Sequence, residues 1–200
     1  MKFTEISKHL GKYRVGIAGA GGLGSNCAIA LARSGVGTLI IADFDIIEPA
    51  NLNRQYYFSD QVGMAKTDAL KENIGRINPS VTVSAYKIRL DAANIPMIFA
   101  GCDIIVEAFD QASEKEMLTE TVQEKMPGIP LIIGSGMAGW GKSDLLKCKK
   151  ADEFLYVCGD ESSEVSEELP CLAPRVGIVA NMQANLVLEI LLHKVKKNSG

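Results

Sequence analysis

A glycine-rich turn between a strand-like and a helix-like stretch constrains this chain most. "RVGIAG" (14–19) is an apolar run ended by glycine, as expected of a buried strand. "GLGSNCAIALARSG" (22–35) has apolar residues at helical spacing before a final glycine. The connecting "GAGGLGS" (19–25) matches the pattern G-x-G-x-x-G. In such turns the first glycine bends the chain, the second admits a phosphate, and the third lets helix pack on strand.

The same alternation of strand and helix continues to residue 135. Further strands are predicted at 37–45, 81–88, 103–109 and 130–135, and helices at 64–78 and 112–126. Asn94 would cap a short helix that has Pro96 in its first turn. This order predicts an α/β, Rossmann-like, doubly wound and mainly parallel sheet. Ligands of such sheets bind at the carboxyl ends of the strands.

The pattern is less regular after residue 136. "GMAGWGKSDLLKCKK" (136–150) has too many glycines for a helix and is expected to lead into short strands such as "FLYVC" (154–158). The acidic stretch 159–171 predicts a mobile surface loop, and 173–197 a long closing helix with Pro174 in its first turn. At 200 residues we expect one domain. Its parts are an N-terminal segment (1–13), a core (14–135), a crossover segment (136–172) and the closing helix (173–197).

Composition excludes several classes of function. A net charge of −3 gives no electrostatic reason to expect a nucleic-acid partner. No apolar run has the length of a signal peptide or a membrane span, so we expect no membrane association. The five cysteines are scattered and odd in number, which favours a reducing cytoplasm. None has C-x-x-C spacing, so no zinc is expected.

Polar residues gather where the second strand ends. Asp43 follows the glycine turn at the distance where a carboxylate binds ribose hydroxyls. The next loop holds Asn51, Arg54 and Gln55, and an arginine offers two parallel donors to a phosphate. Lys66 opens the following helix, where it would place a point charge on a phosphate. Either basic side chain taken alone is more simply a solvated surface charge.

Asp110 adds a carboxylate at the same predicted edge. It is interpreted as the end of the strand at 103–109, where one or two carboxylates together with phosphates can hold Mg²⁺. It could equally cap the helix at 112–126, and the two roles are compatible. The glycine turn, the ribose acid, the basic pair and this acid together indicate Mg-ATP.

These motifs resemble, in order and spacing, those of a known family. "GAGGLGS", "DFD" (43–45), "NLNRQ" (51–55), Lys66, "RINP" (76–79) and "EAFD" (107–110) are similar to the adenylation domain shared by bacterial ThiF and MoeB and the ubiquitin-activating enzymes. The resemblance covers roughly residues 10 to 192. "GSGMAGWG" (134–141) and "APRVGIVANMQANLVLE" (173–189) look most like the short ThiF-type sulfur carrier protein adenylyltransferases.

The resemblance implies a reaction and a set of site residues. A ubiquitin-like, ThiS-like sulfur carrier would attack the α-phosphate of ATP with its C-terminal Gly-Gly carboxylate, giving an acyl-adenylate and pyrophosphate for thiamine thiazole synthesis. The implied ATP-binding residues are Gly19, Gly21, Gly22, Gly24, Asp43, Asn51, Arg54, Gln55 and Lys66. Arg54, Lys66 and Asp110 would be catalytic, with Asp110 holding Mg²⁺, and the role of Asp45 stays open. A homodimer is also implied.

The chain departs from the family in two places. It lacks the two C-x-x-C pairs of longer relatives. It also lacks the N-terminal arginine that in the family reaches the partner subunit's ATP, since before Arg14 there are only the lysines Lys2, Lys8 and Lys12 to supply a cation. Cys171 is a candidate nucleophile for later sulfur chemistry. The alternative is an inert thiol, its pKa raised by Glu164, Glu167 and Glu168. Cys27 and Cys102 are expected to be buried.

Four other functions remain open. Two share the chemistry with another acceptor, namely activation of a carrier of the molybdopterin-synthase type and ATP-dependent tRNA modification. The others are a nucleotide-binding scaffold without catalysis and an NAD-dependent oxidoreductase using the same turn. Arg54, Lys66 and Asp110 argue against the oxidoreductase, because a dinucleotide enzyme needs no such cluster.

Overall fold

The computed structural model describes residues 2–197, with side chains placed for residues 2–193. The elements are α1 (Phe3–Leu10), β1 (Arg14–Ala18), α2 (Gly22–Ser34), β2 (Thr38–Asp43), η1 (Pro49–Asn53), η2 (Ser59–Gln61), α3 (Lys66–Ile77), β3 (Thr82–Lys87), α4 (Ile95–Ile98), β4 (Ile104–Glu107), α5 (Ala112–Lys125), β5 (Leu131–Gly134), η3 (Ser143–Leu145), β6 (Lys147–Lys150), β7 (Leu155–Gly159) and α6 (Ala173–Lys197).

The strands described form one seven-stranded sheet in the order β3-β2-β1-β4-β5-β7-β6. Neighbouring strands are parallel, except that β6 runs antiparallel to β7 at the edge. The strand order reverses between β1 and β4, which is the topological switch point where ligands bind in doubly wound sheets. The fold class is therefore the α/β, Rossmann-like one predicted from the sequence.

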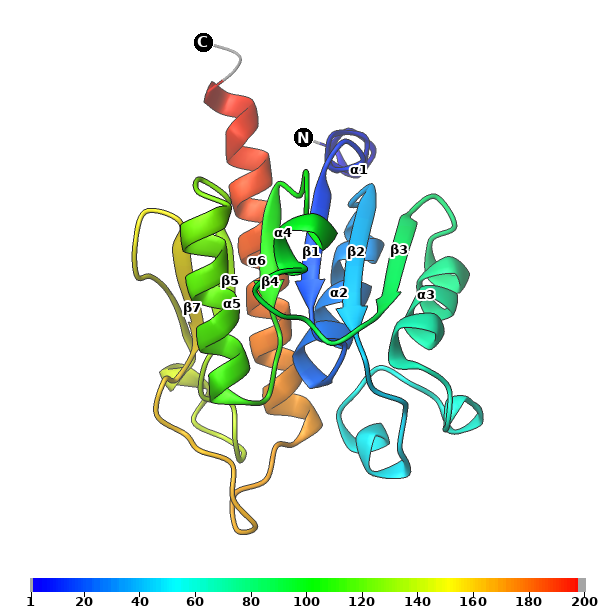
Figure 1. Cartoon of the computed structure of the whole chain (residues 1–200), viewed down its shortest axis with the longest axis vertical. Coiled ribbons are helices and arrows are strands. Elements are labelled where there is room, and N and C mark those ends of the chain that lie inside the picture. Colours follow the sequence, from blue (N-terminus) through cyan, green and yellow to red (C-terminus); the bar gives the residue numbers. More distant parts are fainter. Residues whose placement is uncertain (1, 198–200) are drawn as a thin grey trace.

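Helices cover both faces of the sheet (Figure 1): α2, α3 and α6 lie on one face, and α4 and α5 on the other. Alternation along the strands produces the two layers. Val15 and Ile17 of β1 face the α2–α6 layer, whereas Ala18 faces the layer of α4 and α5. Both layers are mainly apolar, so the central strands read as continuous hydrophobic runs rather than as alternating ones.

Most predicted elements are confirmed within a few residues. Gly35 ends α2 in the left-handed conformation (φ 90°), and Pro96 and Pro174 lie at the starts of α4 and α6. Asn94 occupies the N-cap position of α4, as predicted, but its side chain makes no capping hydrogen bond. Its side chain instead accepts a hydrogen bond from the Asp91 amide and donates one to the Arg89 carbonyl. Helix α1 was not predicted, although Phe3, Ile6 and Leu10 recur at the spacing of one helix face; its only buried residue is Leu10.

The closing helix α6 belongs to the core. By length and composition alone, residues 173–193 would suffice to cross a membrane. Val179, Val187 and Leu191 are nevertheless fully buried against the rest of the protein, and α2 and α6 pack along each other. Such packing accounts for the apolar character of the helix without a lipid environment.

The carboxyl ends of the parallel strands share one edge of the molecule (lower edge in Figure 1). The glycine turn after β1, the loop 44–65 after β2 and the loop after β4 all lie there. The crossover segment returns to the same edge before α6 begins, so segments far apart in sequence meet at one place.

Candidate functional site

The glycine turn is fixed by close backbone contacts. Gly19 has a φ of +98°, and a Cβ there would lie 2.8 Å from the Ala108 carbonyl oxygen. A Cβ on Gly24 would lie 1.9 Å from the Gly19 carbonyl oxygen. Any side chain at these two positions would force the turn away from β4 or lift α2 off the turn. These contacts give a steric reason for the first and third glycines of the motif.

At Gly21 and Gly22 the absence of a side chain matters for space, and neither residue has a positive φ. A Cβ on Gly21 would come within 4 Å only of the Gln55 side-chain nitrogen, at 3.8 Å, so the turn is open beside Gln55. A Cβ on Gly22 would lie 2.9 Å from a Val176 methyl group and 3.6 Å from Arg54 Cγ. The first turn of α2 therefore packs between α6 and the loop after β2. Its leading amides point out of the helix end, where they can bind an anion.

Asp43 connects the turn to the end of β2. One carboxylate oxygen accepts the Ala20 amide at 2.6 Å, and the other accepts the Asp45 amide at 2.8 Å. Burial raises the pKa of Asp43, although these two hydrogen bonds and the nearby Lys66 act in the opposite direction. Each oxygen keeps a lone pair, which is what the predicted ribose contact requires.

Lys66 is buried and already paired with a carboxylate. Its ammonium lies 2.7 Å from a carboxylate oxygen of Asp45, and its backbone amide donates to the Asp45 carbonyl at 3.0 Å. The Lys66 side chain is 8% exposed, whereas that of Asp45 is 47% exposed. Asp45, whose role the sequence left open, thus holds Lys66 at the sheet edge from the solvent side.

The loop 51–55 places its polar residues in different ways. The Asn51 carboxamide oxygen accepts the Glu48 amide at 3.0 Å and so closes the first turn of η1. The Arg54 guanidinium donates to the Asn53 side chain at 2.8 Å. Gln55 is buried, and its side-chain oxygen has no hydrogen-bond partner among the described residues. A buried unpaired oxygen beside an open glycine turn is a reason to expect a ligand donor there.

Three further residues clamp this loop to the glycine turn. The buried Tyr57 hydroxyl donates to the Ala20 carbonyl at 2.7 Å. The Ser25 hydroxyl accepts the Tyr56 amide at 2.9 Å, and the Asn26 carboxamide donates to the Arg54 carbonyl at 3.0 Å. Sequence reasoning missed this clamp. The sequence did contain one signal for it, the adjacent polar residues Ser25 and Asn26 near the start of α2. Such residues on an exposed helix would face water, so their contacts with the loop could not be inferred from them.

Asp110 lies in a loop beyond the end of β4, rather than at the strand end as predicted. Strand β4 ends at Glu107, and Gln111 occupies the N-cap position of α5, so Asp110 neither ends the strand nor caps the helix. The strand ends before Asp110, where the Glu107 carboxylate accepts the Phe109 and Gly134 amides, and the helix begins too late for Asp110 to cap it. Asp110 is exposed in the loop between the two elements, with no hydrogen bond or ion pair to another residue in the described part of the chain.

Glu107 is a fully buried carboxylate that the sequence reading did not single out. The Lys115 ammonium lies 2.8 Å from one of its oxygens and also donates to the Gly134 carbonyl at 2.9 Å. The carboxylate accepts the Phe109 amide at 2.6 Å and the Gly134 amide at 3.2 Å. Burial raises the pKa of Glu107, and Lys115 opposes this. Glu107 thereby joins the ends of β4 and β5 to α5 and fixes the loop that carries Asp110.

The crossover segment is held by a buried ion pair between Arg175 and Asp160. Arg175 also donates to the Gly141 carbonyl at 2.6 Å, and Asp160 accepts the amides of Ser162 and Ser163 at 2.9 and 2.8 Å. Burial alone would raise the pKa of Asp160, but these amides and Arg175 together lower it to about 2. The predicted surface loop is thus exposed over most of its length but anchored at its start.

Cys171 lies half-buried where the crossover segment reaches the site. Its pKa is raised, as the sequence suggested, but the cause is burial rather than the neighbouring glutamates, and the charge of Arg54 acts in the lowering direction. Cys27 and Cys102 are buried, as expected.

The arrangement has the chemistry of a polyphosphate site. The open glycine turn, the amides of the α2 N-terminus, Lys66 and Arg54 present positive charge and donors along one edge. Among residues 2–193, no group of three or more His, Cys, Asp or Glu side chains could hold a metal by itself. Asp110 nevertheless offers a hard oxygen ligand, and Mg²⁺ usually combines one or two carboxylates with phosphates and water.

Comparison with known proteins identifies the family to which the chain is similar. The family described as the ThiF family matches residues 3–200. The molybdopterin-synthase adenylyltransferase of Salmonella typhimurium is 30% identical over 192 residues, covering 94% of this chain and 76% of that protein. The SAMP-activating enzyme E1 of Haloferax volcanii is 36% identical over 194 residues, covering 94% of this chain and 70% of that protein.

Solved structures share the fold. The E. coli tRNA N6-threonylcarbamoyladenosine dehydratase in complex with AMP superposes with a TM-score of 0.86 at 20% identity, covering 96% of this chain and 91% of that one. Its complex with ATP gives a TM-score of 0.82 at 22% identity. At these identities the likeness concerns the fold alone. The match along almost the whole chain, joined to relatives at 30% identity and above, shows that the chain belongs to the ThiF family.

Proposed function

We propose that this protein is an adenylyltransferase that uses Mg-ATP to activate the C-terminal Gly-Gly carboxylate of a ubiquitin-like sulfur carrier protein. The observation that carries the proposal is the meeting of the open glycine turn, Lys66 and Arg54 at one sheet edge. The sequence relatives are named adenylyltransferases or activating enzymes, which supports nucleotidyl transfer as the reaction class.

Binding of ATP assigns a task to each residue at this edge. Asp43 accepts the ribose hydroxyls, and Gly19, Gly21, Gly22 and Gly24 bring the α2 amides close to the phosphates. Gln55 and Asn51 line the site from the loop side. Lys66 can turn from Asp45 to a phosphate at small cost, because Asp45 is half exposed and water can replace the ammonium.

The reaction is an in-line displacement at the α-phosphate. A carrier carboxylate oxygen forms the new P–O bond while the bond to pyrophosphate breaks, and no enzyme residue becomes covalently bound. The barrier is lowered mainly by holding the two anions in line and by neutralising their charge. Arg54 and Lys66 would supply that charge on the phosphates as the pyrophosphate leaves.

Asp110 is the residue we assign to Mg²⁺. It fits because it is a carboxylate exposed at the correct edge and free of any protein partner in the described residues. When bound, the ion neutralises phosphate charge. Glu107 and Lys115 fix the backbone that precedes Asp110, and Ala108 in that segment packs against Gly19 of the glycine turn.

The carrier tail must reach the α-phosphate as an extended peptide. We infer that the crossover segment 136–172 covers this tail, since it returns to the site and is anchored by Arg175. Cys171, half-buried at the end of the crossover segment, is the residue to examine for later sulfur chemistry. A cytoplasmic homodimer, as the family resemblance implies, completes the proposal.

The carrier is proposed to be of the thiamine (ThiS-like) type. One observation favours a second candidate, because the Salmonella relative, of which the chain covers 76%, is named for molybdopterin synthase. The two candidates use the same chemistry and differ only in the protein that is activated.

ATP–pyrophosphate exchange tests the proposal. The protein is assayed with Mg-ATP alone, with a ThiS-type carrier, with a molybdopterin-synthase-type carrier, and with each carrier lacking its final Gly-Gly. Exchange that requires an intact Gly-Gly end supports the proposal and identifies the carrier. Three results would contradict the proposal. Exchange that requires tRNA would indicate ATP-dependent tRNA modification, and ATP binding without any exchange would indicate a scaffold without catalysis. Binding of NADH in place of ATP would indicate an oxidoreductase.

A further inference from the structure

Two cysteines face each other across the edge of the sheet, away from the site described above. Strands β6 and β7 are antiparallel, and Cys148 is the direct register partner of Cys158. Directly opposed residues of an antiparallel pair project to the same face, with Cα atoms about 4.5 or 5.5 Å apart. Both spacings lie within the range of about 4.4–6.8 Å that a disulfide spans.

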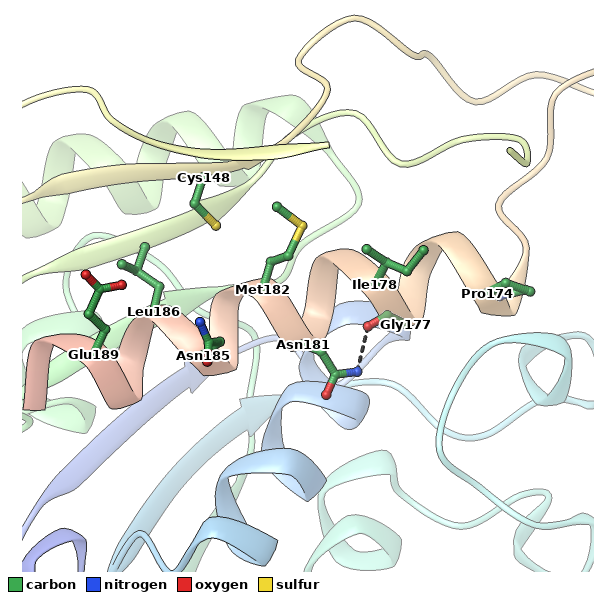
Figure 2. Close-up of a pocket in the computed structure, with 9 residues that line it drawn as sticks. All are labelled: Cys148, Pro174, Gly177, Ile178, Asn181, Met182, Asn185, Leu186 and Glu189. Carbon is green, nitrogen blue, oxygen red and sulfur yellow. Dashed lines mark hydrogen bonds between the residues drawn. The ribbon is translucent and has the colours of Figure 1, made fainter. Parts of the chain in front are cut away.

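The two thiols differ in access. Cys158 is fully buried in the core layer that contains α2 and α6, whereas Cys148 on the edge strand is exposed. Cys148 lines an open groove of about 670 Å³ between β6 and α6. Figure 2 shows its sulfur directed toward the helix, on the side of Met182 and Leu186. A small solute can reach Cys148, whereas Cys158 has no exposed surface.

We propose that Cys148 and Cys158 form a peroxide-sensitive thiol pair, in which Cys148 is the reacting cysteine and Cys158 the resolving one. The inference does not depend on the adenylation reaction and would stand if that proposal failed. It rests on the strand register, on the contrast in burial and on the open groove. The remaining cysteines of the chain have no cysteine in such a register position.

The chemistry requires two steps and one oxidant, hydrogen peroxide. The Cys148 thiolate attacks one peroxide oxygen, the O–O bond breaks, and the departing hydroxide takes up the thiol proton as water. Cys158 sulfur then attacks the Cys148 sulfenic acid, the S–S bond forms, and the S–O bond breaks to release a second water. Overall, two thiols lose two hydrogens and one peroxide is reduced to two waters.

The electrostatics of the pair follow this order of events. A hydrogen bond with Cys158 lowers the pKa of Cys148, despite burial of part of the thiol and the nearby carboxylate of Glu189. The same hydrogen bond, together with burial and the charge of Cys148, raises the pKa of Cys158. Once Cys148 is a neutral sulfenic acid, both effects of its charge on Cys158 disappear, and the second thiol becomes easier to ionise.

The bond would fasten the edge strand to the body of the sheet. Cys158 precedes Asp160 by two residues, and Asp160 anchors the crossover segment through Arg175. Oxidation would therefore fix β6 against β7 within this segment. Lys149 and Glu161 already form an ion pair between the same two parts of the chain.

The test is peroxide titration of the whole protein followed by non-reducing peptide mapping. At about one equivalent of peroxide, we expect loss of two hydrogens and a single cross-linked peptide joining Cys148 to Cys158, reversed by dithiothreitol. In Cys158→Ser, sulfenic acid at Cys148 should accumulate, and its labelling by dimedone should rise by roughly tenfold over wild type. Cys148→Ser should show no cross-link and no rapid oxidation of Cys158.

Cys171→Ser is the matched control, because Cys171 is also partly accessible but has no opposed thiol. Its cross-link should form as in wild type. The proposal is overturned if wild type joins another pair, if Cys148 is over-oxidised while Cys158 stays reduced, or if Cys171 reacts before Cys148. Mapping of wild type alone decides the first two outcomes, so a poorly folded variant would not leave the question open.

Discussion

Two lysine–carboxylate pairs lie at the same edge of the sheet but in opposite surroundings. In the Asp45–Lys66 pair the carboxylate is 47% exposed, whereas in the Glu107–Lys115 pair the carboxylate is fully buried. Glu107 accepts two backbone amides besides its lysine, and Lys115 also bonds to a carbonyl. The separation of the charged atoms is nearly the same, 2.7 and 2.8 Å, so geometry alone does not distinguish the pairs.

The difference lies in what can replace a lost partner. Water can replace Lys66 at Asp45, so this lysine is free to bind a phosphate. Nothing can replace Lys115 at Glu107, because the carboxylate is out of reach of solvent. We infer that the open pair belongs to the ligand site and the buried pair to the fold.

Removing Lys115 should have the largest effect on stability. Lys115→Met leaves a buried carboxylate without its ion partner, and we expect a loss of about 3–5 kcal/mol in the free energy of unfolding. Lys66→Met is the matched control and should cost about 1 kcal/mol or less, since Asp45 can turn to water. Chemical denaturation measures both. If both variants lose the same free energy of unfolding, the two ion pairs do not differ in the way described.

The two carboxylates of the motif "EAFD" (107–110) differ in the same way, because Glu107 is buried and Asp110 is exposed. Asp110→Asn should lower carrier-dependent pyrophosphate exchange by roughly 10²–10³-fold, by weakening charge neutralisation at the phosphates. Its unfolding curve should match wild type, because the side chain is exposed and makes no protein contact in the described residues. A fully active Asp110→Asn variant would refute the assigned role in Mg²⁺ binding.

The Asp160–Arg175 pair offers a test by pH. The pKa of Asp160 is lowered from 3.8 to about 2 in the folded protein, so the unfolded chain takes up the proton first as the pH falls. The stability contributed by this carboxylate is complete above about pH 5 and declines toward pH 2. In Asp160→Asn the decline between these values should be shallower.

The exposed Lys149–Glu161 pair supplies the control for that measurement. Glu161→Gln should leave the acid limb of the stability curve close to wild type, because an exposed pair contributes little. If Asp160→Asn follows the wild-type curve throughout, the buried pair does not anchor the crossover segment as described.

The smallest effect is expected at Cys171. Cys171→Ser should change pyrophosphate exchange by less than about twofold, because adenylation requires no thiol and the substitution is nearly isosteric. The exchange assay compares it directly with wild type. A large loss of exchange would place this cysteine in the adenylation step itself, contrary to our assignment.

The sequence predicted most of the fold, because its signals are local. Glycine at 19 and 24, apolar runs of strand length and proline at 96 and 174 each act within a few residues, and the structure has the corresponding turn, strands and helix starts. Helix α1 was not predicted, although Phe3, Ile6 and Leu10 are spaced as on one helix face; of its residues only Leu10 is buried.

The site was only partly predictable, because its supporting contacts join distant segments. Lys66 was identified, but its pairing with Asp45 depends on how the loop 46–65 folds back. The clamp of Ser25, Asn26 and Tyr57 and the buried bonds of Glu107 likewise depend on tertiary contacts. Asp110 was placed at the strand end for the same reason, since nothing local shows that Glu107 occupies it.

Thermal unfolding with and without Mg-ATP tests the central claim most directly, because a ligand that binds only the folded state raises the melting temperature. We predict that saturating Mg-ATP raises the Tm of wild type and of the destabilised Lys115→Met by similar amounts, and raises that of Lys66→Met far less. A full shift in Lys66→Met, or a shift lost only in Lys115→Met, would contradict the assignment of the open pair to the nucleotide site.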